Sequence, residues 1–245
     1  MKRTTITLAC TVLAVASLGI ARYHVSGPNQ KDPPTPIQVG VMSEKQREHG
    51  KLYTQYTGRK LDAIPQREFK SGVEPGVYIE PPTPVINPDM PPLLFEDFLR
   101  HLRCDVDAVF SVTIKDKAAQ LTENKEFIFT DYTAIVEELY KNNDTAPIGS
   151  GGLITVTRPG GRVEIDGKVV SALDSSFKHL KVGQRYLLFL KFLPQTSSFQ
   201  CVRLGCFLIN ANELIPMTEE SLPGGVGDTR EFNLSVRTAL SAACK

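Results

Sequence analysis

From residue 105 to residue 216, apolar and polar positions repeat with the period of two that is typical of β-strands. The clearest case is 106–114, where every second residue is apolar, and this pattern predicts a half-buried strand. Residues 127–140 predict one long strand, and a strand of this length commonly bends so that it serves two sheets. Residues 186–193 are apolar at almost every position, which predicts a central strand buried on both faces.

Short turn signals separate the predicted strands. Asp166-Gly167 stands between two strand-like segments and predicts a two-residue hairpin. Pro159-Gly160-Gly161 predicts a second turn, and Gly205 predicts a bend within a strand at 198–210. Closely spaced short strands favour a sandwich or a barrel, and the long bent strand favours the barrel. We therefore expect residues 104–216 to form a mainly β, five- or six-stranded antiparallel OB-like barrel.

Helical periodicity frames the predicted barrel on both sides. Residues 93–103 predict a packing helix, because one apolar stripe runs along it: Leu94, Phe95, Phe98, Leu99 and Leu102. We expect this stripe to cover one face of the central strand. Residues 217–245 predict a linker and a C-terminal helix that Asp228 and Glu231 cap. The buried stripe of that helix is expected to comprise Phe232, Val236, Ala239 and Leu240.

A proline-rich arm is predicted at residues 22–92. This segment holds 12 of the 17 prolines, and proline removes the N–H donors that a continuous sheet or helix needs. We expect the arm to be largely irregular, with one short helix near 43–58. Ser43 and Gln46 have the spacing of a capping box at its start. The apolar face of this helix is narrow, so we expect loose docking.

The first 21 residues resemble a secretory signal peptide. Two basic residues precede a 16-residue apolar run at 6–21, which ends in small residues. The run is short for a membrane span, but an uncleaved N-terminal anchor remains an alternative. Lipidation at Cys10 is disfavoured, because the apolar run continues well beyond it. The protein is therefore expected to be exported, to the periplasm or beyond the cell, and to contact a membrane only through residues 6–21 if they are retained.

Composition excludes some functions. The 28 basic and 27 acidic residues balance, which argues against a nucleic-acid-binding face. The four histidines, His49 among them, are scattered singly and are expected to be surface or packing residues. No nucleophile motif, metal-ligand spacing or phosphate loop is present, so we assign no catalytic, metal or cofactor-binding residues and expect no cofactor. Arg158, Gly160 and Gly161 are a candidate binding loop, because they fall on a predicted hairpin tip.

Four cysteines follow the signal segment, and export would let them form disulfides. Cys104 opens the first strand, while Cys201 and Cys206 lie on a late strand that can neighbour it. We therefore expect Cys104 to pair with Cys201 or Cys206. In an extended strand Cys201 and Cys206 would lie about 16 Å apart, so a bridge between them requires the chain to fold back at 203–205. Cys244 is expected to stay free.

Three segments of the sequence support a comparison with known families. Their layout resembles that of netrin-like, tissue-inhibitor-of-metalloproteinase-like OB barrels: the segment 104–110, the long strand 132–141 and the segment Leu180 to Phe189. More closely, they resemble uncharacterised exported bacterial proteins that carry such a barrel. The inhibitors act through a free N-terminal cysteine, whereas about 80 residues separate Cys104 from the expected cleavage site. The resemblance therefore implies a fold and not protease inhibition.

The expected function is that of an exported, non-catalytic binding or interaction β-barrel. Its partner would be an unidentified protein or envelope ligand and not a nucleic acid, because OB barrels bind through exposed faces and loops. An enzyme of unrecognised type is the first alternative, since catalytic groups distant in sequence leave no local motif. An inhibitor or accessory subunit of an envelope enzyme is the second, by fold analogy.

Overall fold

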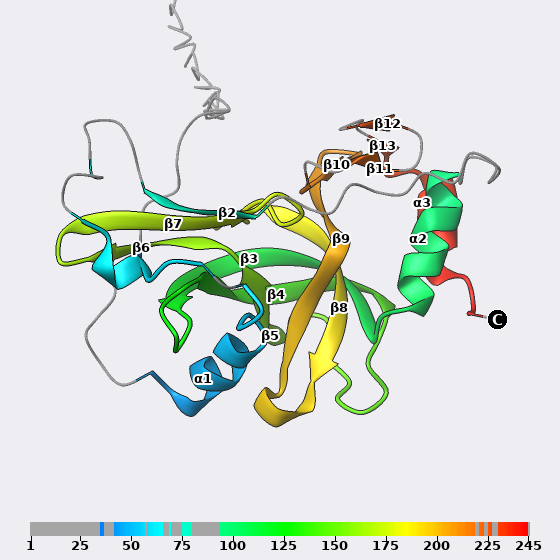
Figure 1. Cartoon of the computed structure of the whole chain (residues 1–245). Coiled ribbons are helices and arrows are strands. Elements are labelled where there is room, and N and C mark those ends of the chain that lie inside the picture. Colours follow the sequence, from blue (N-terminus) through cyan, green and yellow to red (C-terminus); the bar gives the residue numbers. More distant parts are fainter. Residues whose placement is uncertain are drawn as a thin grey trace, which may run out of the picture. The chain divides into compact units, whose positions relative to one another are not determined.

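A computed structural model describes residues 35–36, 42–56, 58–65, 69, 75–79, 94–218, 221–222, 225–226 and 230–244. The expected signal peptide, most of the proline clusters and the expected helix cap Asp228 lie outside these residues. The protein is mainly β, as expected (Figure 1). Of the helices in the described part, none is both long and apolar enough to cross a membrane.

Five long strands form the centre of the main sheet. They are β3 (Ala108–Leu121), β4 (Ile128–Lys141), β5 (Leu153–Pro159), β8 (Arg185–Leu193) and β9 (Ser198–Asn210). β3 lies between β4 and β8, and β4 also pairs with β5; all three pairings are antiparallel. β9 runs antiparallel to β8, and its short pairing with β5 is the one parallel pair among these five strands. Each of the five strands therefore has two hydrogen-bonded neighbours among the other four.

Shorter strands extend this sheet beyond β9. β10 (Glu213–Pro216) pairs with β9, and β13 (Arg230–Glu231) pairs with β10. β11 (Ser221–Leu222) and β12 (Gly225–Val226) form a separate two-stranded ribbon. The turn between β8 and β9 contains the short 3-10 helix η3 (Pro194–Thr196).

A second sheet combines a hairpin with segments of the proline-rich arm. β6 (Gly161–Ile165) and β7 (Lys168–Asp174) form the hairpin, with Asp166 at φ 50° and Gly167 at φ 74°, as the Asp-Gly signal predicts. Two arm strands, β1 (Thr35–Pro36) and β2 (Gly76–Ile79), add to its edges in parallel. The arm also forms the helix α1 (Glu44–Lys51) and the 3-10 helix η1 (Leu61–Ala63).

Buried apolar side chains of the described residues gather in three clusters. The first draws its residues mainly from β3, β4, β5, β8 and β9, and includes Phe110, Tyr132 and Leu188. The second lies between β8, β9 and the two later helices. The third joins η1 and the chain just after α1 to the β3–β4 hairpin and the second sheet. β8 separates the first two clusters and is buried on both faces, as its apolar run predicts.

Two helices cover the outer face of β8 and β9 (Figure 1). α2 (Phe95–Cys104) buries Phe95 and Leu99, and α3 (Leu234–Ser241) packs beside it. The expectation that Leu94 joins the buried stripe is wrong: Leu94 precedes the helix as its N-cap residue and is 66% exposed. The expected apolar stripe of α3 is buried in full, at Phe232, Val236, Ala239 and Leu240.

The N-cap of α3 differs from the expected one. Asn233 occupies this position, and its side-chain oxygen accepts a hydrogen bond from the Val236 backbone N–H at 3.2 Å. We expect Asn233→Ala to lower the free energy of unfolding by about 1 kcal/mol, because one N–H at the helix start loses its partner. Chemical denaturation measures the change. Leu234→Ala on the exposed first residue of the helix is the control, expected within about 0.5 kcal/mol, and equal losses in both variants would contradict the capping role.

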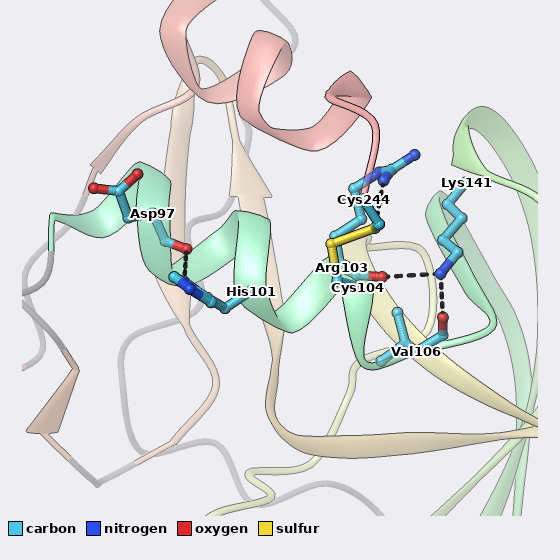
Figure 2. Close-up of a disulfide and its surroundings, with 7 residues drawn as sticks. All are labelled: Asp97, His101, Arg103, Cys104, Val106, Lys141 and Cys244. Carbon is cyan, nitrogen blue, oxygen red and sulfur yellow. Dashed lines mark hydrogen bonds between the residues drawn. A yellow bond between two sulfur atoms is a disulfide. The ribbon is translucent and has the colours of Figure 1, made fainter.

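A disulfide ties the end of α2 to the segment after α3 (Figure 2). It joins Cys104 to Cys244, with 5.5 Å between the Cα atoms. The prediction of a disulfide is confirmed, but the expected pairing of Cys104 is wrong, and so is the expectation of a free Cys244. The physical reason is the packing of α3 along α2, which brings the C-terminal segment to Cys104. Next to the bridge, Lys141 Nζ donates to the carbonyls of Arg103 and Val106 at 3.1 and 2.6 Å.

Candidate functional site

α1 begins as the sequence predicts but docks more closely than expected. The Ser43 side chain accepts from the Gln46 backbone N–H at 3.2 Å, and the Gln46 side chain accepts from the Ser43 N–H at 2.9 Å, which completes the capping box. The helix is polar throughout, yet His49 is fully buried. The expectation of loose docking is therefore wrong, because polar contacts hold the helix where its narrow apolar face does not.

His49 connects α1 to the strands β4 and β9 and to the 3-10 helix η3. Its Nδ1 lies 2.9 Å from both carboxylate oxygens of Asp131 on β4. Its Nε2 lies 2.7 Å from Ser198 Oγ at the start of β9 and 3.1 Å from Thr196 Oγ1 in η3. The two hydroxyls are 2.6 Å apart. We call these four residues the His49 cluster.

The His49 cluster is part of a larger polar face that includes β5. Alternate residues of a strand point to opposite sides, so one side of β5 can be polar while the other is apolar. On β5, Ile154 and Val156 enter the first apolar cluster, so Thr155 and Thr157 point outward. Both meet the α1 segment: Lys45 Nζ donates to Thr155 Oγ1 at 3.0 Å, and a Tyr53 hydroxyl donates to Thr157 Oγ1 at 3.3 Å. We call this face, formed by Asp131, Thr155, Thr157, Thr196 and Ser198, the α1 face.

Aromatic side chains anchor the chain just after α1. The Tyr53 ring stacks on Phe129 with 5.6 Å between centroids, and the Tyr56 ring stacks on Phe127 at 4.3 Å. Tyr56 OH donates to Asp174 Oδ2 at 2.8 Å. Burial raises the pKa of both tyrosines, so both phenols remain protonated donors at neutral pH. The segment is thus attached in two ways, by polar contacts along the helix and by stacked rings after it.

The order of groups in the His49 cluster is that of a serine hydrolase triad. A carboxylate contacts one imidazole nitrogen and a hydroxyl contacts the other, as base-activated nucleophiles require. However, Ser198 is fully buried, so no substrate reaches its Oγ while α1 is in place. His49 is itself part of α1, and moving the helix away would remove the base. The contact between His49 and Ser198 and the approach of a substrate to Ser198 therefore exclude each other. The geometry supports attachment of α1 rather than acyl transfer.

His49 should contribute measurably to stability. We expect His49→Ala to lower the free energy of unfolding by about 1–3 kcal/mol, because buried polar groups of Ser198 and Asp131 lose their shared partner. Thermal or urea unfolding of the full chain measures the change. Arg47→Ala, on an exposed position of the same helix, is the matched control and should stay within about 0.5 kcal/mol. A loss no larger than the control would show that the cluster does not hold α1.

The candidate binding loop is not a hairpin tip. Arg158 is 1% exposed and follows Ile154 and Val156 into the interior. At Gly161 an added Cβ would stand 2.6 Å from Thr130 Oγ1, so only glycine permits this close approach of the backbone. Gly160, at φ 88°, links β5 to β6, and the chain passes there from one sheet to the other. The physical reason for the error is that this turn lies between sheets and not at a free edge.

The remaining candidate residues also occupy the interior. Cys201 and Cys206 are free and buried. Within the described ranges, no group of three or more His, Cys, Asp or Glu side chains has the arrangement of a metal site. His49 itself was expected to be a surface or packing residue, and sequence reasoning missed its partners because they lie 82 and 149 positions away.

Comparison with known proteins adds no relative. No protein-family model matches the chain, and no curated protein matches it. The function is therefore inferred from the geometry of the α1 face and of the interior cysteines.

Proposed function

We propose that this protein is an exported bacterial, non-catalytic interaction protein built on an OB-like barrel. The strand pairings support this reading: β3, β4, β5, β9 and β8 are hydrogen-bonded in that order, and β8 pairs again with β3. Five strands in this cyclic order, with one parallel pair between β5 and β9, make an OB-like barrel the simplest description. The signal-like segment 1–21 and the disulfide suit export.

The proposed binding surface is the α1 face. OB barrels commonly bind ligands on their second and third strands and on the turn between the fourth and fifth. In this chain those elements are β4, β5 and the η3 turn, which are the elements that α1 contacts. The main observation in support of the proposal is that His49 of α1 hydrogen-bonds to Asp131 and Ser198 on this face, as a side chain of a bound peptide would.

The chemistry of the face suggests the class of ligand. It presents a carboxylate at Asp131 and hydroxyls at Thr155, Thr157 and Ser198. Such groups suit a peptide segment that carries cationic and hydroxyl donors, as Lys45 on α1 and Tyr53 just after it do. We propose that the partner supplies a segment of this kind, and that α1 and Tyr53 give way to it while the Tyr56 ring stays stacked on Phe127.

The proposal is tested by measuring the binding of a labelled synthetic peptide of residues 42–58 to the α1 face of the full chain. We expect this peptide to bind the full chain weakly, and to bind the Lys45→Ala/His49→Ala variant at least tenfold more tightly, since the internal helix then competes less well. Fluorescence anisotropy measures both affinities. The same variant should retain more protein in a pull-down from envelope extract, and the peptide should elute what is retained.

A further substitution separates binding to the face from non-specific binding. Adding Asp131→Asn to the opened variant removes the charge that faces His49 and should reverse the gain in affinity. Arg47→Ala, which leaves the contacts of α1 unchanged, should behave as the unmodified chain. Equal affinity of the peptide for all variants, or no binding to any of them, would overturn the assignment of this face.

A further inference from the structure

Cys201 and Cys206 are brought together by an irregularity in β9. Leu190 of β8 pairs with Cys201, but Leu188 pairs with Cys206, so residues 202–205 form a bulge opposite Phe189. Leu204 takes the left-handed conformation at φ 60°, and an added Cβ on Gly205 would meet Val202 Cγ2 at 2.5 Å. The strand thus folds back at the place where a bridge between the cysteines requires it.

The resulting geometry suits a disulfide. Leu188 and Leu190 are two positions apart on an extended strand, or about 6.6 Å, and their partners are separated by a similar distance. Disulfides join Cα atoms up to about 6.8 Å apart. The two thiols point to the same side, into the first apolar cluster. The Cys201 thiol also lies 3.7 Å from the Gly205 carbonyl oxygen across the bulge.

A buried cation stands beside the two thiols. Arg158 enters the same cluster from β5 and interacts electrostatically with both Cys201 and Cys206. Its Nη1 donates to the Lys178 carbonyl at 2.8 Å, but within the described residues its Nε and Nη2 have no hydrogen-bond partner. A buried guanidinium with unused donors favours a nearby anion, and a thiolate is the anion that the adjacent residues can supply.

We propose that Cys201 and Cys206 are a redox-active dithiol that closes to an intrachain disulfide by exchange with a disulfide compound, and that Arg158 is the positioning residue that stabilises the reacting thiolate. The site is separate from the α1 face, because the strand positions that carry the three residues point into the interior. The inference therefore does not depend on the proposed function.

The exchange transfers two electrons from the two thiols to the external disulfide. Cys201 loses its proton, and its thiolate attacks one sulfur of the external disulfide, whose other sulfur leaves as a thiolate and takes up a proton. Cys206 then loses its proton and attacks the Cys201 sulfur in the mixed disulfide, which releases the second external thiol. The protein loses two electrons and two protons, and the external disulfide is reduced to two thiols.

The local electrostatics favour Cys201 as the attacking group. The hydrogen bond from Cys206 lowers the pKa of the Cys201 thiol against the effect of burial, and the charge of Arg158 acts in the same direction. Burial raises the pKa of the Cys206 thiol, so Cys206 stays protonated while the Cys201 thiolate makes the first attack. Access requires only local opening, because Arg203 at the centre of the bulge is exposed, while Val202 and Leu204 are half-buried.

Trypsin mapping tests the disulfide directly. The full chain is incubated folded with oxidised glutathione, its free thiols are alkylated in denaturant, and it is digested without reductant. Cleavage after Arg203 separates Cys201 on peptide 192–203 from Cys206 on peptide 204–230, so only a disulfide keeps these peptides together. We expect the linked pair after oxidation and two alkylated peptides after mild reduction. The pair 104–115 with 238–245 reports Cys104–Cys244 as an internal control.

The rate of closure tests the role of Arg158. We expect Arg158→Gln to slow formation of the link about tenfold at neutral pH, because loss of the buried charge raises the pKa of the Cys201 thiol. Arg185→Gln, at an exposed arginine, is the matched control and should react at the rate of the unmodified chain. If Arg158→Gln does not fold, the pH dependence of the unmodified chain decides. Its rate of closure should level off at a lower pH than the reaction of free cysteine with the same disulfide, whereas a rise that continues as far as that of free cysteine is the behaviour of an ordinary thiol.

Several results would overturn the proposal. They are two alkylated peptides from the oxidised folded chain, a stable glutathione adduct on Cys201 without closure, and an unchanged rate in Arg158→Gln.

Discussion

Replacing Cys104 or Cys244 by serine is expected to lower the free energy of unfolding by about 2–5 kcal/mol. The bridge closes a loop across a sequence separation of 140, and the chain-entropy model assigns about 5 kcal/mol to a loop of this length, while measured losses are commonly smaller. It also holds the C-terminal segment beside α2, where α3 covers one side of β8 and β9 (Figure 2). Urea unfolding of the oxidised chain and of each variant measures the difference.

The two variants should be equivalent, because each removes the same link. The double variant Cys104→Ser/Cys244→Ser should therefore lose no more stability than either single one, a clear departure from additivity. Limited proteolysis of the variants should release α3 before it cleaves the long strands. An unchanged melting temperature in both single variants would show that helix packing alone holds the C-terminal segment.

Local patterns predicted the strands and turns of the main sheet well. The apolar run 186–193 predicted a strand buried on both faces, and β8 confirms it because apolar clusters lie on each side. Asp166-Gly167 predicted the hairpin of β6 and β7, since a tight turn needs residues that accept positive φ angles. These features depend on neighbours in the sequence, which is why the sequence alone reveals them.

The candidate sites depend on contacts between distant segments, and the sequence did not reveal them. α1 has the composition of a solvated helix, and nothing local shows that His49 meets Asp131 and Ser198. The turn signal Pro159-Gly160-Gly161 predicts a hairpin tip at Arg158, although the turn in fact links two sheets. One signal did point inward: Arg158 continues the alternation of Ile154 and Val156, so its side chain had to share their face.

The cysteines illustrate the effect of one backbone irregularity. The separation of about 16 Å expected between Cys201 and Cys206 assumes a continuous strand. The left-handed turn at Leu204 and the close approach at Gly205 remove that assumption. A glycine in a strand signalled a bend, but its effect on the register with β8 appears only when the two strands are paired.

Phe189 lies where the bulge, the central strand and the helical cover meet. Its side chain is fully buried, and its ring makes an edge-on contact with Phe207 at 6.1 Å between centroids. Phe207 in turn contacts Phe95 of α2 at 5.8 Å. The Gly205 backbone approaches Phe189 so closely that an added Cβ would stand 2.9 Å from the Phe189 Cβ. Phe189 therefore packs against the bulge of β9 and, through Phe207, helps to hold α2 against the sheet.

We expect Phe189→Ala to lower the free energy of unfolding by about 3–5 kcal/mol, because it leaves a cavity in a close-packed cluster that the strands cannot fill. Phe192→Ala, at a half-buried position of the same strand, should cost clearly less. In a double-mutant cycle, Phe189→Ala and Phe95→Ala should couple by about 0.5–3 kcal/mol through their shared neighbour Phe207. Additive losses would mean that α2 is seated independently of the central strand. A loss below about 1 kcal/mol in Phe189→Ala would contradict the placement of β8 at the centre of the fold.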